Sequence, residues 1–178
     1  MADASENLPC GFFNREARTT VDITPEGTWQ LFVECGDATP NQGHVGLCFA
    51  QARFDGESIN FDKRRSRRQL IPHGGNPYVK YVPGHGLLIV HGMLQDPLSP
   101  FGPDWYITAT TIDEGGWIVK THQDFAIGVP GIHICDPHLV DLPDGRLMMA
   151  MSVDQAKVYT ATAELTYAEL YEDLMKTE

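Results

Sequence analysis

An internal repeat of about 60 residues is the feature of this sequence that most constrains its fold. The segment NPYVKYVPGHGLLIV, residues 76–90, aligns without a gap with DPHLVDLPDGRLMMA, residues 136–150, so the two copies lie 60 residues apart. A weaker copy at residues 21–33 has the same Pro-x-Gly turn followed by an apolar strand, and its Pro25 lies 58 residues before Pro83. A fixed period of this length predicts that one supersecondary unit recurs three times.

Each copy continues into further strands. A second recurring string is rich in β-branched, aromatic and small residues, and it reads LCFAQA at 47–52, YITATT at 106–111 and VYTATA at 158–163. In the first two copies a glycine-containing turn follows, and then another short strand, at 59–61 and 117–120. Each unit is therefore predicted to be a four-stranded antiparallel meander. The predicted units of this single domain are approximately 18–71, 72–130 and 131–178.

Four-stranded units of this kind cannot bury both of their faces alone, so they are expected to stack against one another. Radial stacking gives a β-propeller, and propellers close with roughly four to eight blades. The predicted fold is all-β, with three four-stranded blades that a homodimer completes to six. A β-sandwich and a closed barrel are the alternatives, but neither predicts the long repeat. Near the C-terminus, apolar residues at helical spacing favour a short helix over an outer strand at 167–175.

Composition and charge exclude several partners. The 178-residue chain is 42% hydrophobic, which is enough for one packed core, but no apolar run approaches the roughly 18 residues of a membrane span. The polar start MADASENLP does not resemble a secretion signal, and the formal charge of −11 argues against nucleic-acid binding. Four cysteines without CxxC spacing predict reduced thiols. We therefore expect a cytoplasmic protein with neither a membrane nor a nucleic acid as its partner.

The repeated segments resemble those of a known superfamily. The string DPHLVDLPDGRL at 136–147 is similar to the blade-opening strands of sialidase-like and arabinanase-type glycosidase propellers, and the middle copy, which begins at Asn76, looks like the equivalent blade. The similarity extends over most of residues 18–165. It implies a glycoside hydrolase-like protein that acts on or binds a carbohydrate, or a small polar ligand, at the central axis. It also implies carboxylates on the innermost strands of several blades.

Glycoside hydrolysis normally requires two carboxyl groups, one protonated and one acting as base or nucleophile. Asp136 matches the inner-strand position, whereas the middle copy has Asn76 there. The first copy offers Arg18 or Asp22, depending on a one-residue gap.

A hydrolase of this type would use Asp136 as base or nucleophile-supporting carboxylate, Glu34 or a partner-chain residue as acid, and His138 as an orienting neighbour. In a two-fold dimer, two copies of Asp136 would face one axis and supply a carboxylate pair.

A sugar site also needs flat aromatic faces and planar amide or guanidinium groups. Trp105 follows a proline-rich loop at 96–104, and long loops on rigid scaffolds often carry recognition. The alternative is a loop that packs over a blade edge or forms the dimer contact. The predicted substrate-binding residues are Arg18, His73, Asn76, Tyr78, His91 and Trp105.

The densest polar cluster is HICDPH at 133–138, which holds four potential metal ligands within six residues. Imidazole, carboxylate and thiolate groups suit zinc or another transition ion, so a divalent metal held by His133 and His138 is one hypothesis. The spacing matches no known zinc pattern, and the alternative is an inner strand that lines a wet channel. Three functions thus stay open: a glycosidase-like hydrolase, a non-catalytic module that binds a glycan or small ligand or supports assembly, and a metal-dependent enzyme.

Overall fold

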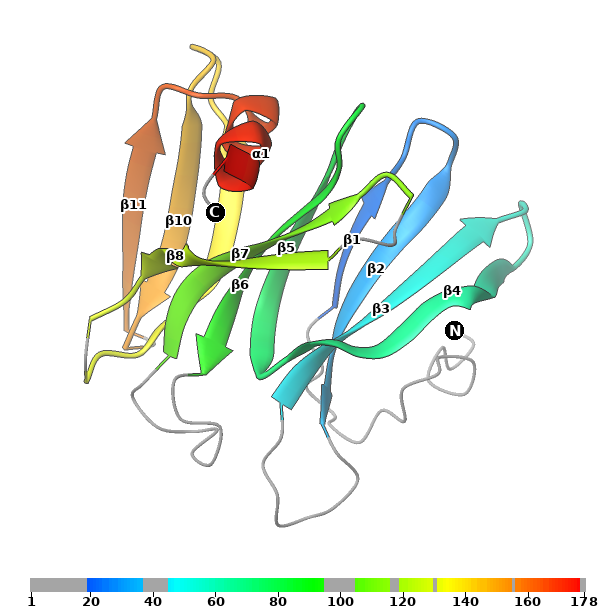
Figure 1. Cartoon of the computed structure of the whole chain (residues 1–178), viewed down its shortest axis with the longest axis horizontal. Coiled ribbons are helices and arrows are strands. Elements are labelled where there is room, and N and C mark those ends of the chain that lie inside the picture. The colour runs from blue at the N-terminus through cyan, green and yellow to red at the C-terminus, as the bar shows by residue number, and fades with distance from the viewer. Residues whose placement is uncertain are drawn as a thin grey trace.

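The computed structural model describes residues 19–36, 45–94, 105–115, 119–129, 131–154 and 156–176. Over these ranges the chain forms eleven strands and one short helix, and the strands belong to three separate antiparallel sheets (Figure 1). The predicted all-β architecture is therefore confirmed.

The strands of each sheet follow one another in chain order, as in a meander. Sheet 1 contains β1 (Thr19–Ile23), β2 (Thr28–Gly36), β3 (Val45–Phe54) and β4 (Ile59–Pro72). Sheet 2 contains β5 (Gly74–Val82), β6 (Gly86–Leu94), β7 (Trp105–Asp113) and β8 (Val119–Ile127). Sheet 3 contains β9 (Ile134–Asp141), β10 (Leu147–Val153) and β11 (Lys157–Ala163).

Sheet 2 lies between the other two sheets, as Figure 1 shows. Its first strand, β5, contacts β1, β2 and β3 of sheet 1, and it also contacts β9 of sheet 3. Strands β6 and β7 pack on β9 as well. The first strands of the three sheets thus lie together, with β5 in the middle.

Two hydrophobic cores join the sheets, and β6 contributes to both. Leu87 and Ile89 belong to the core between sheets 1 and 2, whereas Leu88 and Val90 belong to the core that sheet 2 shares with sheet 3 and the helix α1 (Tyr167–Lys176). Successive residues of a strand point to opposite faces, so a strand that is covered on both sides needs a continuous apolar run. The run GLLIVHGML of β6 meets this requirement.

Two of the turns that mark the repeat, those of sheets 1 and 3, share one geometry. In sheets 1 and 3, the residue before the proline donates its N–H to the carbonyl four residues later, from Thr24 to Thr28 (2.9 Å) and from Leu142 to Arg146 (2.8 Å). The turn glycines of these two sheets, Gly27 and Gly145, have φ angles of 77° and 86°, a left-handed conformation that glycine adopts at no steric cost. In sheet 2 the left-handed residue of the turn is Gly84 (77°), which lies one position earlier, directly after Pro83.

Sheet 3 differs from the predicted four-stranded unit. Among the described residues it has three strands, and after β11 the chain forms α1 instead of a fourth strand. A capping box begins the helix: Thr166 Oγ1 accepts the N–H of Glu169 (3.3 Å), and the Glu169 carboxylate accepts the N–H of Thr166 (2.7 Å). The predicted C-terminal helix is confirmed, and the prediction of four strands in the third unit is wrong.

The prediction that the cysteines are reduced thiols is also wrong for Cys48. Cys48, a buried residue of β3, is disulfide-bonded, whereas Cys135 is a free, buried thiol. The scattered spacing carried no signal because a disulfide joins residues that only the tertiary structure brings together. Disulfides persist in oxidising compartments, so the predicted cytoplasmic location loses the support that reduced thiols would give it.

Within the described ranges, no helix combines the length and the apolar character that crossing a membrane requires.

Candidate functional site

A groove of about 600 Å³ runs along the innermost strands of the three sheets. We call it the axial groove. It is lined by Val21, Asp22, Asn76, Pro77, Tyr78, Val79, Lys80, Asp136, Pro137 and His138. These residues come from β1, β5 and β9.

The two gap-free copies of the repeat form the same backbone irregularity at this groove. Asn76 and Asp136 both have left-handed φ angles, 49° and 54°, and each precedes a proline. In both strands the pairing register shifts at this point, as in a β-bulge. Asn and Asp tolerate the left-handed region better than other non-glycine residues, and proline disfavours the helical region for the residue before it. The repeat therefore encodes a bend that aims one polar side chain per strand.

The carboxylate of Asp136 is half-buried, and the neighbouring Cys135 donates its S–H to Asp136 Oδ2 (3.2 Å). A thiol is a weak donor, so this contact positions the carboxylate without neutralising it. Strained backbone of this kind persists only where the surroundings hold it in place, and it is frequent at functional sites.

Two aromatic rings lie beside this carboxylate. The rings of Tyr78 and His138 meet edge to face, with centroids 4.7 Å apart and planes at 73°. The Tyr78 hydroxyl also shares a hydrogen bond of 3.0 Å with the hydroxyl of Tyr167, which anchors α1 to β5. Burial, together with the hydrogen bond to Tyr78, raises the pKa of Tyr167, so its phenol stays protonated. The helix thus fixes one wall of the axial groove.

A second carboxylate, Asp22, enters the groove from β1. Its Oδ2 accepts the backbone N–H of Tyr81 (2.6 Å) and lies 3.8 Å from Lys80 Nζ. The matching turns place Asp22 level with Val140, four residues beyond Asp136. Four strand residues span about 13 Å, which is more than the roughly 5–9.5 Å between paired carboxyl groups in glycosidases. Asp22 therefore holds β1 on β5 at a different level from Asp136.

The structure brings four of the predicted site residues together, namely Asn76, Tyr78, Asp136 and His138. It does not place the other described candidates in the groove. His91 is completely buried, its Nδ1–H donates to the Gly92 carbonyl and its Nε2 accepts the hydroxyl of Thr110, each at 2.9 Å. Burial lowers its pKa to about 4, so His91 is a neutral core residue of sheet 2.

Trp105 and His133 also lie away from the groove. Trp105 is 6% exposed and packs against Gly92, where a Cβ atom would meet the Trp105 ring at 2.9 Å. The ring centroids of Trp105 and His133 are 6.0 Å apart. His73 joins β4 to β5, and its carbonyl accepts the N–H of Leu94 (3.1 Å).

Two predicted residues cannot be placed. Glu34 belongs to β2, where it pairs with Leu47, but its side chain lies outside the described part of the structure. Arg18 also lies outside the described residues. The position of the carboxyl group of the predicted acid, Glu34, is therefore outside the described structure.

Sequence reasoning missed Lys80 and Tyr167. Lys80 lies two residues after Tyr78 in β5, so strand alternation was a signal that could have placed it on the same face. Tyr167 does not line the groove, but α1 brings it against Tyr78 and Lys80, which do, and no local sequence pattern predicts that contact.

No cluster of ligand side chains in the described structure supports the metal hypothesis. Among the residues that the structure describes, no group of three or more His, Cys, Asp or Glu side chains is arranged to hold a metal ion. His138 contacts Tyr78, whereas the backbone N–H of His133 donates to Asp154 (3.2 Å). A divalent metal at these histidines stays a prediction.

No protein-family model matches the chain, and no curated protein is significantly similar to it in sequence. Solved structures are similar in fold. The alpha-L-arabinanase of Penicillium chrysogenum, complexed with arabinobiose, matches with a TM-score of 0.54 at 11% identity, over 83% of this chain and 46% of that chain. The endo-arabinase of Bacteroides thetaiotaomicron VPI-5482 matches with a TM-score of 0.48 at 14% identity, over 80% of this chain and 54% of that chain.

A mutant of the NanB sialidase of Streptococcus pneumoniae matches more weakly, with a TM-score of 0.43 at 13% identity, over 81% of this chain and 21% of that chain. This chain spans about half the length of the two arabinanase structures. The three stacked meanders and the likeness in fold to the Penicillium arabinanase support a propeller-like fold.

Proposed function

We propose that this protein binds a carbohydrate in the axial groove, with Asp136 as the main polar contact. The observation that carries the proposal is the shared bulge of β5 and β9, which directs Asn76 and Asp136 into one groove beside Tyr78 and His138. Carboxylate and amide groups bond sugar hydroxyls, and flat rings contact the apolar faces of sugars. The arabinobiose complex of the similar arabinanase agrees with a ligand of this class.

Titration calorimetry and thermal unfolding with arabinobiose, xylobiose and maltose test this proposal. We expect saturable binding of at least one disaccharide, with a higher unfolding temperature when it is bound. Asp136→Asn should weaken that binding about tenfold or more, because hydrogen bonds to a charged group contribute about 1.5–3 kcal/mol. Asp144→Asn, which changes an exposed carboxylate at a turn, is the matched control. Absence of binding by all three sugars, or equal affinity in both variants, would contradict the proposal.

A glycosidase-like activity is the second candidate function. The exposed faces of sheets 1 and 3 favour a form of this activity that depends on a homodimer. Sheets 1 and 3 each expose apolar residues on the face turned away from sheet 2. On sheet 1 these include Val21 and Ile23, which flank the inward-pointing Asp22, and on sheet 3 they include Val140 and Val158. Ile23 is 50% exposed and Val158 is 76% exposed.

Two copies could cover these faces if sheet 1 of each packs on sheet 3 of the other. We include this homodimer in the proposal, since it would close a six-sheet ring and bring two copies of Asp136 to one axis. That arrangement would supply the second carboxylate that hydrolysis needs.

Light scattering at several concentrations tests the dimer. A mass of twice 19.8 kDa is expected for the wild type, and Ile23→Lys or Val158→Lys should give monomers because a buried lysine opposes the contact. Val129→Lys, at another exposed valine, should leave the mass unchanged. Only the dimeric protein should cleave a chromogenic arabinoside, and Asp136→Asn should abolish this cleavage. A wild-type monomer at every concentration would overturn the dimer while leaving saccharide binding to be judged by its own titration.

A further inference from the structure

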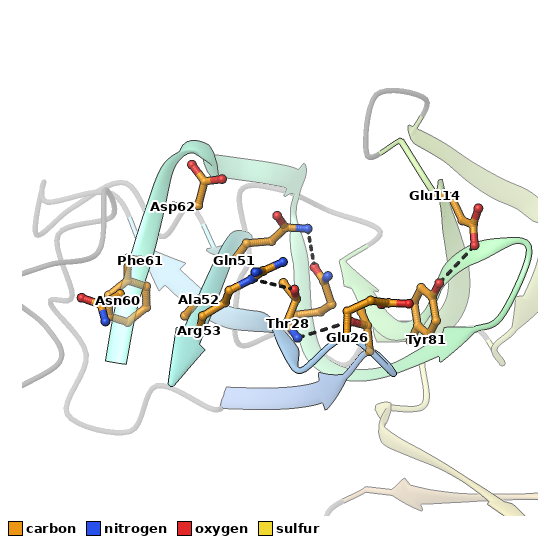
Figure 2. Close-up of a pocket in the computed structure, with 12 residues that line it drawn as sticks. Glu26, Thr28, Gln51, Ala52, Arg53, Asn60, Phe61, Asp62, Tyr81 and Glu114 are labelled. Atoms are coloured by element: carbon orange, nitrogen blue, oxygen red, sulfur yellow. Dashed lines mark hydrogen bonds between the residues drawn. The ribbon is translucent and has the colours of Figure 1, made fainter. Parts of the chain in front are cut away.

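A second hollow, of about 720 Å³, lies between sheets 1 and 2 near the β1–β2 turn (Figure 2). We call it the outer cleft. The residues that matter for its chemistry are Thr28, Gln30, Gln51, Arg53, Tyr81 and Glu114. Its volume falls within the roughly 300–1,000 Å³ of ordinary small-molecule sites.

The sequence of sheet 1 already distinguishes this cleft from the neighbouring core. On the face toward sheet 2, β2 changes from the buried Phe32 to Gln30, and β3 changes from Phe49 to Gln51. Phe32 and Phe49 pack in the core between the two sheets, with ring centroids 5.0 Å apart. The same two strands continue with polar residues where the cleft begins, so the face is apolar where the sheets touch and polar where they part.

In the cleft, Gln51 Nε2 donates to Gln30 Oε1 at 3.0 Å, and Figure 2 draws this bond as a dashed line from the labelled Gln51. Gln30 is only 5% exposed. In the described part of the chain, the amide nitrogen of Gln30 and the amide oxygen of Gln51 make no further hydrogen bond. Both atoms reach solvent in the cleft, so the pair presents one donor and one acceptor to a ligand.

The remaining lining groups set the charge of the ligand. Arg53 Nε donates to Thr28 Oγ1 (3.2 Å), and the Tyr81 hydroxyl donates to Glu114 Oε1 (3.1 Å). Burial, and then the Glu114 carboxylate, raise the pKa of Tyr81, which keeps that phenol neutral. Among the described residues, the cleft is lined by one guanidinium, that of Arg53, and by three carboxylates, those of Glu26, Asp62 and Glu114. The excess of negative charge among these residues disfavours anionic ligands.

The outer cleft and the axial groove are separate. Lys80 and Tyr81 are consecutive in β5, and they line the axial groove and the outer cleft respectively. The hydrogen bond from Tyr81 N–H to Asp22 joins β5 to β1 between the two hollows. Within the described part of the chain, the two hollows have no lining residue in common.

From these observations we infer that the outer cleft is a second binding site, for an uncharged, hydroxyl-rich chain such as a neutral oligosaccharide. The Gln30–Gln51 pair offers a donor and an acceptor side by side, which complements two neighbouring hydroxyl groups. The phenol of Tyr81 and the carboxylate of Glu114 supply further polar contacts at the rim.

Nuclear magnetic resonance titration tests this inference, because the side-chain amide signals of Gln30 and Gln51 report on the cleft directly. The probes are arabinotriose, xylotriose and maltotriose, with trigalacturonate as an anionic comparison. At least one neutral sugar should shift both amide signals, and trigalacturonate should not.

Variants separate the two sites. Gln30→Leu should weaken binding at the cleft about tenfold, the loss expected for one buried hydrogen-bonded amide. If Gln30→Leu does not fold, Gln51→Leu replaces it, because Gln51 is less buried. Asp136→Asn should leave the cleft signals unchanged, and Thr162→Val on the exposed β11 is the control for a general loss of stability.

Two outcomes would overturn the inference. One is that no neutral sugar shifts the Gln30 and Gln51 signals, which would mean that the cleft holds water only. The other is that Asp136→Asn abolishes every sugar-induced shift, which would assign all binding to the axial groove. Failure of disaccharide binding at the axial groove with intact cleft shifts would instead reject the proposed function alone.

Discussion

Sheets 2 and 3 are built on the same repeat, and three differences between them bear on the site and the fold. Their first strands share the left-handed bulge, but it aims an amide from Asn76 in β5 and a carboxylate from Asp136 in β9. In the next strand, the fully buried His91 corresponds to Met151, 60 residues later. The third difference is that sheet 2 ends in a fourth strand, whereas sheet 3 continues into α1. The two copies of the repeat thus share the backbone conformation of the bulge, but the side chains at matching positions differ in chemistry.

The largest effect is expected from the helix that follows sheet 3. Leu174 is 4% exposed and packs in the core between sheets 2 and 3, so Leu174→Ala should lower the free energy of unfolding by about 3 kcal/mol. Urea unfolding measures the loss. The control is Met175→Ala, at the more exposed neighbouring position, with an expected change below about 1 kcal/mol. Equal effects of the two variants would show that α1 does not cover sheet 3 in solution.

The His91 difference should appear as a pH dependence. The folded protein keeps His91 neutral, with its pKa lowered to about 4, whereas the unfolded chain takes up a proton near pH 6.5. The contribution of His91 is therefore fully present above pH 6.5 and is lost as the pH falls toward 4, by about 3 kcal/mol in total.

His91→Met, which copies the residue of sheet 3, should remove most of this slope between pH 7 and about pH 4. His122 has a pKa lowered by burial and by Lys120, so a smaller slope of the same sign should remain. The measurement is the urea midpoint at a series of pH values. An unchanged slope in His91→Met would mean that His91 is accessible to protons in the folded state.

The capping box should contribute less. Thr166→Ala removes the Oγ1 atom that accepts the Glu169 N–H, and we expect a loss of about 1 kcal/mol in the free energy of unfolding. Thr162→Ala, on the exposed β11, is the matched control and should change stability by less than about 0.5 kcal/mol. Circular dichroism would follow the helix in both variants, and a Thr166→Ala protein as stable as the control would contradict the role of the cap.

The smallest effect concerns the shared bulge. Because glycine adopts positive φ without strain, Asn76→Gly and Asp136→Gly should each stabilise the fold by about 0.5 kcal/mol or leave it unchanged. Asn60→Gly, within β4 and without a positive φ, should instead destabilise it by about 0.5–1 kcal/mol. Thermal unfolding of the three variants decides this, and a marked loss of stability at only one of the two bulges would break the equivalence of β5 and β9.

Much of the architecture could be predicted from local patterns. The 60-residue repeat predicted the strand-rich units, because turn residues and alternating apolar residues act within a few positions of one another. The helix α1 followed from apolar spacing, and its capping box is also a local signal. Four of the predicted site residues meet in the axial groove because they occupy matching positions of the repeat.

Other features of the structure could not be predicted from local sequence patterns. His91 and Trp105 looked like site residues in a strand context, but packing on both faces of sheet 2 buries them. His91 lies on the face of β6 that carries Leu87 and Ile89 toward sheet 1, whereas Trp105 lies on the face of β7 that carries Ile107 and Ala109 toward sheet 3. The disulfide at Cys48 also depends on contacts between distant segments.

The sequence alone determined the repeated meander, because turns and strand alternation are properties of neighbouring residues. Only the tertiary structure decided which polar side chains reach solvent together. Asn76 and Asp136 converge on one groove because β5 and β9 pack side by side, whereas His91 is sealed in a core. The physical reason is that burial depends on what stacks on each face of a sheet, and strand patterns do not contain that information.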